Sequence, residues 1–394
     1  MSEWKEYKLG EVGQIVGGAT PSTKNPLNYD GNISWITPKD LSNYNGCFIS
    51  RGERMITTEG YNSCSCKMLP KGSILFSSRA PIGYIVIAAN ELCTNQGFKS
   101  VIPNKDVVDN IFLYYLLHYN KRKIEGLGSG TTFKEVSGSV MKNFPVLLPS
   151  LPTQQKIAAI LSSLDDKIAV NRKISDNLEQ QAQALFKSWF VDFEPFKNGE
   201  FVDSELGRIP KGWKVECVDD FCDVFTGKKD VNKSFSMGQY PFFSCSPTHN
   251  YSNDFIYDGE AILVAGNGSY TGRTSFYIGR FDLYQRTYAC TMKISISKRL
   301  FAFIYFMMKC FFEPSKLGGT RGSSIPYIVM KDITMQSFAY NQSYAEIFSK
   351  FGYDVLVEIQ RRKLESRRLA ELRDTLLPKL MSGELKVNDI EKQL

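Results

Sequence analysis

The chain has 394 residues, of which 43% are hydrophobic, 13% aromatic and 23% charged. This composition excludes disordered, collagen-like and simple coiled-coil chains, and the length fits two or three domains. Nine cysteines and only two histidines, with no secretion signal, favour reduced thiols and no metal site, so we expect a cytoplasmic protein that has no membrane segment. The net charge of +7 favours a polyanionic partner such as DNA, RNA or a membrane surface, although it also fits a plain solvated surface.

One structural plan occurs twice along the chain. The first copy begins at Trp4-Lys5 and the second at Gly212-Trp213-Lys214, and both continue through short strand-like segments separated by turn residues. Corresponding features recur 187 to 190 residues apart, as with Gln96 and Gln285, or the apolar helical stretches 112–119 and 301–312. We therefore predict an α+β fold that contains two similar globular modules of mixed α/β structure.

A long helical segment follows each module, with apolar residues at seven-residue spacing and a polar centre at Asn171 in the first and Arg362 in the second. The matching polar centres predict that the two helices pair. We expect antiparallel pairing, because parallel helices would require the chain of the second module to run back along the whole length of the first helix. The alternative is that each helix packs only on its own domain. The positions predicted for helix pairing and partner docking are Ile157, Leu161, Leu164, Ile168, Asn171, Leu178, Leu185, Trp189, Val355, Ile359, Leu369, Leu376 and Leu380.

These predictions combine into a dumbbell with two similar heads related by a pseudo-two-fold axis. The predicted segments are a first recognition domain (1–152), a first long helix (153–191), a linker (192–211), a second recognition domain (212–342), a second long helix (343–383) and a tail (384–394).

Two similar heads at the ends of a rod suit DNA, because symmetric readers contact half-sites about 34 Å apart on one face of B-DNA. The predicted loops are rich in glycine, hydroxyl groups, amides and long cations, which hold phosphates and reach base edges. The alternative is that the glycine-rich loops only join a helix to a strand. The candidate DNA-binding residues are Thr37, Lys39, Arg79, Gln96, Lys99, Ser129, Thr131, Lys134, Arg273, Gln285, Arg286, Thr320, Arg321 and Ser323.

The sequence has no P-loop, no Gly-x-Ser-x-Gly and no Asn-Pro-Pro-Tyr/Phe motif. We therefore expect a chain that recognises DNA and has no catalytic residues of its own. A free-standing nuclease is the enzymatic alternative.

Several literal stretches resemble the specificity subunit of type I restriction-modification systems: 151–157 (LPTQQKI), 183–193 (QALFKSWFVDF), 206–213 (LGRIPKGW) and 376–385 (LLPKLMSGEL). The resemblance covers essentially the whole chain, although the segment 339–346 before the second helix lacks the Pro-x-x-x-Gln form of the first.

The resemblance implies two target-recognition domains that each read half of a split DNA site. It also implies two helical regions that set the gap and dock two methyltransferase (modification) subunits, with restriction subunits as possible further partners. On this basis the chain is a non-catalytic member of an adenine-methylating and DNA-cleaving complex. It binds no cofactor itself, and S-adenosylmethionine, ATP and Mg²⁺ act on other subunits. The alternative is a duplicated coiled-coil scaffold or adaptor that binds proteins.

Overall fold

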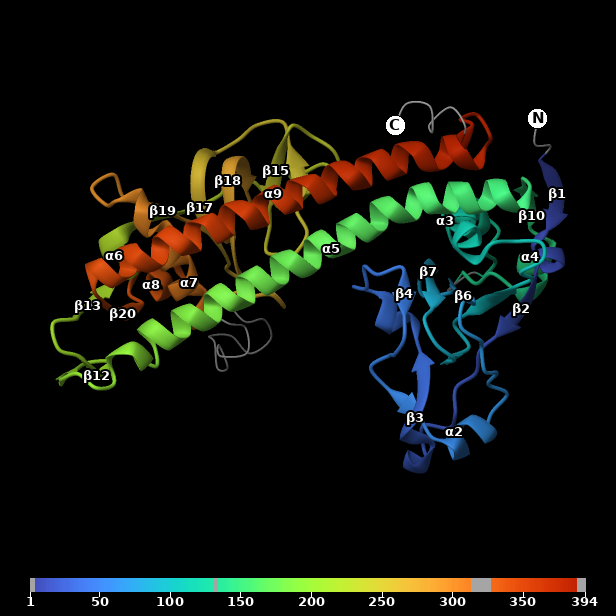
Figure 1. Cartoon of the computed structure of the whole chain (residues 1–394), viewed down its shortest axis with the longest axis horizontal. Coiled ribbons are helices and arrows are strands. Elements are labelled where there is room, and N and C mark those ends of the chain that lie inside the picture. The colour runs from blue at the N-terminus through green and yellow to red at the C-terminus, as the bar shows by residue number, and fades with distance from the viewer. Residues whose placement is uncertain (1–3, 131–133, 313–326, 388–394) are drawn as a thin grey trace. The chain divides into compact units, whose positions relative to one another are not determined.

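The computed structural model describes residues 4–130, 134–312 and 327–387. The chain forms two compact units: unit 1 consists of Met1–Val170 and Glu365–Leu394, and unit 2 of Asn171–Leu364. Each unit contains one globular module and parts of two long helices, α5 and α9 (Figure 1). Among the helices of the described ranges, none combines the length and the apolar character needed to cross a membrane.

The N-terminal module has a central five-stranded sheet in the order β2-β9-β6-β7-β4, a small sheet β5-β3-β8 and a pair β1-β10. Its elements are β1 (Lys5–Lys8), α1 (Leu9–Val12), β2 (Gly13–Gly17), β3 (Tyr29–Ile36), β4 (Phe48–Ile49), β5 (Met55–Ile56), α2 (Thr58–Asn62), β6 (Ile74–Ser78), β7 (Ile82–Ala88), β8 (Cys93–Thr94), β9 (Lys99–Pro103), α3 (Asn110–Gly126), α4 (Gly138–Asn143) and β10 (Pro145–Leu148).

The C-terminal module has a six-stranded sheet in the order β14-β19-β17-β18-β15-β16 and a pair β13-β20. Its elements are β13 (Lys214–Cys217), α6 (Val218–Phe221), β14 (Cys222–Thr226), β15 (Tyr240–Phe243), β16 (Asn250–Ser252), β17 (Tyr257–Ala265), β18 (Thr274–Leu283), β19 (Thr287–Met292), α7 (Phe301–Phe311), α8 (Met330–Thr334) and β20 (Ser337–Tyr340).

The two modules share one topology. The strand order β2-β9-β6-β7 of the first corresponds to β14-β19-β17-β18 of the second, and β1-β10 corresponds to β13-β20. The main difference lies in the segment before β6 of the first module and before β17 of the second. This segment comprises residues 37–73 in the first module and only residues 244–256 in the second. The predicted duplication of a mixed α/β module is confirmed.

One apolar helix fills the core of each module. In α7, all eight residues from Phe301 to Met308 are at most 1% exposed, and in α3 the residues Phe112 to Leu117 are buried. A helix that is apolar on all sides is stable only when it is surrounded by protein. Because each large apolar side chain contributes about 1.5–3 kcal/mol on burial, these helices hold each sheet against the long helices.

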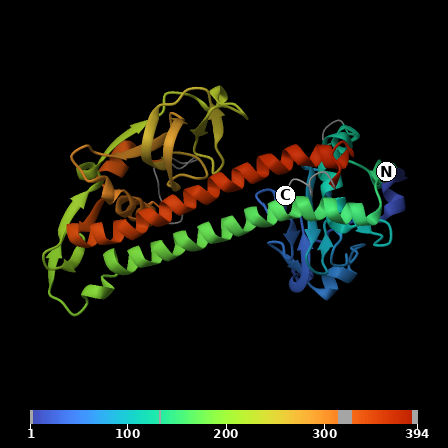
Figure 2. The ribbon, with the colours of Figure 1, turned by 45° about the horizontal axis from the view of Figure 1, so that its top comes forward.

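The long helices α5 (Leu151–Phe190) and α9 (Gln342–Met381) have 40 residues each, and within each unit a segment of α5 lies beside a segment of α9 (Figures 1 and 2). In unit 1, Asp165 of α5 pairs with Arg373 near the end of α9. In unit 2, Asn171 of α5 accepts a 3.0 Å hydrogen bond from Nη1 of Arg362. A second contact in each unit, Lys167 with Glu365 in unit 1 and Phe186 with Phe348 in unit 2, shows that the paired segments run in opposite directions.

Both helices differ slightly from the predicted ranges. They begin at 151 and 342 instead of 153 and 343, and end at 190 and 381 instead of 191 and 383. Pro378 lies within α9, and Gly383 just after it has a φ of 76°, the left-handed conformation common after a helix end. The predicted linker 192–211 contains a hairpin of β11 (Phe201–Ser204) and β12 (Gly207–Pro210).

None of the residues predicted for helix pairing is exposed. Ile157, Leu161, Leu376 and Leu380 pack in the core of unit 1. Leu178, Leu185, Trp189, Val355 and Ile359 pack in the core of unit 2. Leu164, Ile168 and Leu369 are half-buried, and Asn171 is buried. These side chains are therefore packed inside the two units.

Candidate nucleic-acid interface

Three backbone hydrogen bonds draw the candidate loops of the N-terminal module together. Asn95 N donates to Ile36 O at 2.9 Å, Ser78 N to Gly97 O at 2.7 Å, and Val136 N to Ser78 O at 3.0 Å. These bonds place the loops that carry Thr37, Arg79, Gln96 and Lys134 next to one another. We call residues 37–40, 78–81, 95–99, 128–130 and 134–136 the N-terminal loop edge.

The C-terminal module has the same three bonds at corresponding positions. Tyr284 N donates to Phe243 O, Gly266 N to Arg286 O, and Ile328 N to Gly266 O, each at 2.9 Å. We call residues 244–247, 266–273, 284–286 and 327–328 the C-terminal loop edge. The duplication thus extends to the loops, whose backbone framework is the same in both modules.

A glycine in each module allows a further loop to approach this framework. A Cβ atom on Gly18 would lie 2.1 Å from Asn95 O and 2.3 Å from Thr94 O, and one on Gly227 would lie 1.7 Å from Leu283 O. Only glycine permits such a close backbone contact. The loop after β2 and the loop after β14 therefore both lie against the loop that carries Gln96 or Gln285.

The N-terminal loop edge contains an ionic cluster centred on Glu135. Its carboxylate lies 3.1 Å from Lys99 Nζ and 3.6 Å from the Arg79 guanidinium. The side chains are 37% exposed for Glu135, 19% for Lys99 and 36% for Arg79. The two predicted cations are thus partly neutralised by an acid that the sequence did not single out.

The other candidates at this edge are exposed, except for Thr37, which is half-buried. Gln96 is exposed and accepts a hydrogen bond from the Thr20 hydroxyl. Ser129 and Lys134 are exposed. The Thr37 hydroxyl donates a hydrogen bond to the Asp40 carboxylate at 2.7 Å. Lys39 and Glu53 form an exposed ion pair at 2.7 Å, and such exposed pairs contribute little to stability.

Arg273 of the C-terminal loop edge holds two loops together. Its Nη2 donates to Ser246 O at 2.6 Å, and its buried Nε has no hydrogen-bond partner within the described ranges. Burial lowers the pKa of the guanidinium below its ordinary value. These contacts tie the loop after β15 to the β17–β18 turn, so Arg273 positions the edge more than it faces solvent.

Gln285 and Arg286 are the exposed candidates at the C-terminal loop edge. Gln285 donates to Asp230 at 3.1 Å, and Arg286 lines a 340 Å³ pocket together with Gln285, Tyr288 and Tyr327. Four candidates, Thr131, Thr320, Arg321 and Ser323, lie outside the described residues.

A pocket lined by lysines beside Gln285 was not predicted from the sequence. Lys228 and Lys233 line a 610 Å³ pocket next to this residue, and both are exposed. Lys229 between them is bound by Asp282 at 2.7 Å and Asp254 at 3.1 Å. The adjacent lysines Lys228 and Lys229 could have indicated this basic pocket from the sequence. They follow the second strand of their module, at the position that Ala19 and Thr20 occupy in the first copy.

The two edges differ in their side chains although their backbones match. At corresponding positions Gly97 becomes Arg286, Lys99 becomes Tyr288 and Glu135 becomes Tyr327, whereas Gln96 and Gln285 are the same. Tyr288 donates to Ile328 O at 3.2 Å, so a tyrosine occupies the place of the Lys99–Glu135 ion pair. Such a pattern gives each edge its own set of hydrogen-bond donors and acceptors.

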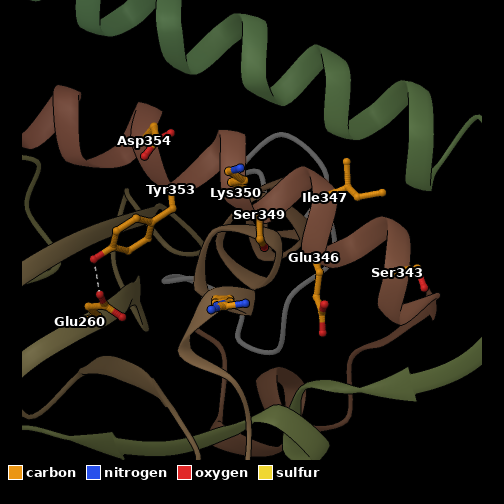
Figure 3. A pocket seen from close by; sticks show the side chains of 9 residues that line it. Glu260, Ser343, Glu346, Ile347, Ser349, Lys350, Tyr353 and Asp354 are labelled. Carbon is orange, nitrogen blue, oxygen red and sulfur yellow. Dashed lines mark hydrogen bonds between the residues drawn. The ribbon is translucent and has the colours of Figure 1, made fainter.

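Another pocket, of 790 Å³, lies at the beginning of α9 (Figure 3). Glu346, Lys350 and Tyr353 line it from α9, and Tyr353 donates to Glu260 of β17 at 2.5 Å. Its lining mixes acids and bases and includes none of the candidate residues. Among the described residues, no group of three or more His, Cys, Asp or Glu side chains could hold a metal ion.

The family model for the type I restriction modification DNA specificity domain matches residues 1–180 and again 210–360. The chain belongs to the type I restriction-modification DNA specificity family. The two matched ranges cover the two copies of the module, together with α5 as far as residue 180 and α9 as far as residue 360.

The chain is also similar to full-length specificity subunits. It is 35% identical to the MjaIX specificity subunit of Methanocaldococcus jannaschii, over 98% of this chain and 95% of the relative. It is 25% identical to the HindI specificity subunit of Haemophilus influenzae, over 98% and 100%. The S subunit of M. genitalium has the same fold, with a TM-score of 0.58 over 96% of both chains at 17% identity. These findings favour the DNA specificity function over a protein-binding scaffold.

Proposed function

We propose that each loop edge reads one half of a bipartite DNA site, with 1–152 and 212–342 as the two recognition domains. The observation that carries this proposal is the shared framework of three backbone hydrogen bonds, on which different side chains are mounted. A common framework would dock each module on the duplex in the same way, while the different side chains would select different bases.

Within this proposal the exposed residues have distinct roles. Gln96, Gln285 and Arg286 face base edges, because amides and guanidinium groups form paired hydrogen bonds to purines in the major groove. Ser129, Lys134, Lys228 and Lys233 contact phosphates, which fix position without reading sequence. The residues that tie loops together, such as Arg273 and Thr37, hold the readers in place.

The long helices set the gap between the half-sites and carry two methyltransferase subunits. An exposed apolar stripe on α9, with Tyr344 38%, Ile347 58% and Phe351 46% exposed, offers a docking face beyond the buried pairing residues. Methylation, translocation and cleavage belong to the partner subunits, which bind S-adenosylmethionine, ATP and Mg²⁺. The target adenine would be flipped into the pocket of the methyltransferase.

The test is an exchange of residues 212–342 for the corresponding segment of another family member, followed by mapping of methylated sites in the host genome. We expect a new second half-site with an unchanged first half-site and gap. The matched control exchanges residues 1–152 and should change the first half-site alone. A change in both half-sites after either exchange would contradict modular reading.

A further inference from the structure

Residues of the two units can be compared position by position. On the core helices, 191 residues separate Phe112 of α3 from Phe303 of α7, and both are completely buried. The same separation relates Ile157 of α5 to Phe348 of α9, each 1% exposed. It also relates the first residues of the two long helices, Leu151 and Gln342. Each contact among these helices in one unit therefore has a defined counterpart in the other.

Unit 1 contains a polar cluster between its two helix segments. Asp165 of α5 forms an ion pair with Arg373 of α9, and the Tyr115 hydroxyl of α3 donates to the other carboxylate oxygen at 2.6 Å. The Asp165 side chain is only 10% exposed and that of Arg373 28%. We call Asp165, Arg373 and Tyr115 the unit 1 polar cluster.

Unit 2 has apolar residues at all three corresponding positions. The counterpart of Asp165 is Leu356, that of Arg373 is Ala182, and that of Tyr115 is Phe306. All three are 0% exposed and belong to one hydrophobic core. The two ends of the helix pair are thus chemically unlike, although the surrounding fold is the same.

We propose that the unit 1 polar cluster makes α5 pair with α9 and excludes pairing with the same helix of a second chain. In an antiparallel pair of two α5 helices, Asp165 would face Ala182 of the second copy. In a pair of two α9 helices, Arg373 would face Leu356. The first arrangement buries Asp165 without a counter-charge, and the second leaves Arg373 only the exposed Asp374 of its own helix at 2.8 Å. Both are destabilising relative to the α5–α9 pair, in which Asp165 and Arg373 satisfy each other.

The centre of the helix pair provides an independent argument. Asn171 and Arg362 occupy equivalent positions, 191 residues apart, and they contact each other at 3.0 Å. In a pair of two α9 helices, Arg362 would therefore meet a second Arg362. The like charges, with an Arg362 side chain only 18% exposed, disfavour that pair further. Buried polar groups that fix the partner of a helix are well known in coiled coils.

A charge-reversal experiment with full-length chains tests the proposal and needs no DNA. The single variants Asp165→Arg and Arg373→Asp each place like charges opposite each other within one chain. When the two variants are refolded together, exchange of helices between them restores both ion pairs. We expect a one-to-one dimer of the two chains by light scattering, at a fraction at least tenfold above that of wild-type chains refolded at the same concentration.

The matched control is the double variant D165R/R373D, which restores the pair within one chain and should behave as wild type. If the control folds and the mixed single variants give no dimer, the proposal is wrong.

If the control itself does not fold, the variant Y115F/D165L/R373A tests the proposal instead. It replaces the three residues of the unit 1 polar cluster by the apolar residues found at the corresponding positions of unit 2. We expect this variant to remain folded and to form exchanged dimers at least tenfold more than wild type after refolding with a differently tagged copy. An unchanged dimer fraction would overturn the proposal.

Discussion

Glu135 binds both Lys99 and Arg79 at the N-terminal loop edge. A carboxylate at a surface that meets phosphates weakens general attraction to DNA, yet it keeps the two cations in one geometry. For Glu135→Gln we expect binding to unrelated duplex DNA to strengthen about threefold to tenfold, because one negative charge is lost and two cations are released. Discrimination between cognate and unrelated DNA should fall. Competition binding at two salt concentrations measures both effects.

The control for this change is Glu200→Gln. Glu200 forms an exposed pair with Lys211 at 2.5 Å beside the β11–β12 hairpin, and neither residue belongs to a loop edge. This variant adds the same net charge and should leave DNA binding nearly unchanged. Weaker binding of Glu135→Gln to unrelated DNA would contradict the proposed role of the carboxylate.

His118 makes the stability of unit 1 dependent on pH. It lies on α3 against Tyr114, and its Nε2 is buried and has no hydrogen-bond partner within the described ranges. Burial, followed by the nearby charges of Lys121 and Arg373, lowers the pKa of His118 to about 4. The unfolded chain takes up this proton below a pKa of about 6.5, so folding stability should fall as the pH decreases from about 6.5 to 4, by at most about 3 kcal/mol.

Urea unfolding at pH 7 and pH 4.5 measures this dependence. The variant His118→Gln should lose less stability between the two pH values than wild type does. The exposed His249 provides the control, because His249→Gln should keep the wild-type difference. An equal loss in His118→Gln and wild type would rule out His118 as the source.

At the scale of the element, α9 divides its faces between two tasks. Val355, Leu356 and Ile359 pack in the core of unit 2, while Ile347 and Phe351 remain exposed. We expect Ile347→Asp with Phe351→Asp to weaken association with the methyltransferase subunit at least tenfold, because a docking face loses apolar contacts and acquires charge. Unfolding and DNA binding of the isolated chain should stay close to wild type.

Leu206→Asp is the control for the α9 face, since Leu206 is 44% exposed in the hairpin β11–β12. It changes an exposed apolar residue to the same acid on a different element and should leave association unaffected. Titration calorimetry with the purified methyltransferase subunit measures both variants. Equal weakening in the two would show that the effect does not depend on α9.

At the scale of the whole molecule, two independent readers predict additive effects on specificity. Gln96→Ala should relax base selection in the first half-site only, and Arg286→Ala in the second only. Each should cost about 1–3 kcal/mol of binding to the cognate site. The double variant should lose the sum, because the residues belong to different modules and share no partner.

Binding to duplexes with one altered half-site measures this additivity. For Gln96→Ala, an altered first half-site should weaken binding less than it does for wild type, while an altered second half-site should weaken binding as much as before. A deviation from additivity of more than about 0.5 kcal/mol would show that the two modules are coupled.

The sequence alone determined the duplication, the apolar core helices and the two long helices. Hydrophobic periodicity and capping are local properties, so the helix bounds differed from those observed by no more than two residues. Matching segments such as 112–119 and 301–312 placed α3 and α7 correctly at the same point of each module.

Only the tertiary structure decided which loops meet and which side chains remain available. Glu135 lies beside Arg79 and Lys99, Arg273 turns inward to Ser246, and Asp165 meets Arg373, although 208 residues separate the last pair. Contacts between residues so far apart depend on the packing of the whole sheet and helix layer. For this reason residue type indicated which side chains could bind DNA, while burial and ion pairing determined which of them are exposed to do so.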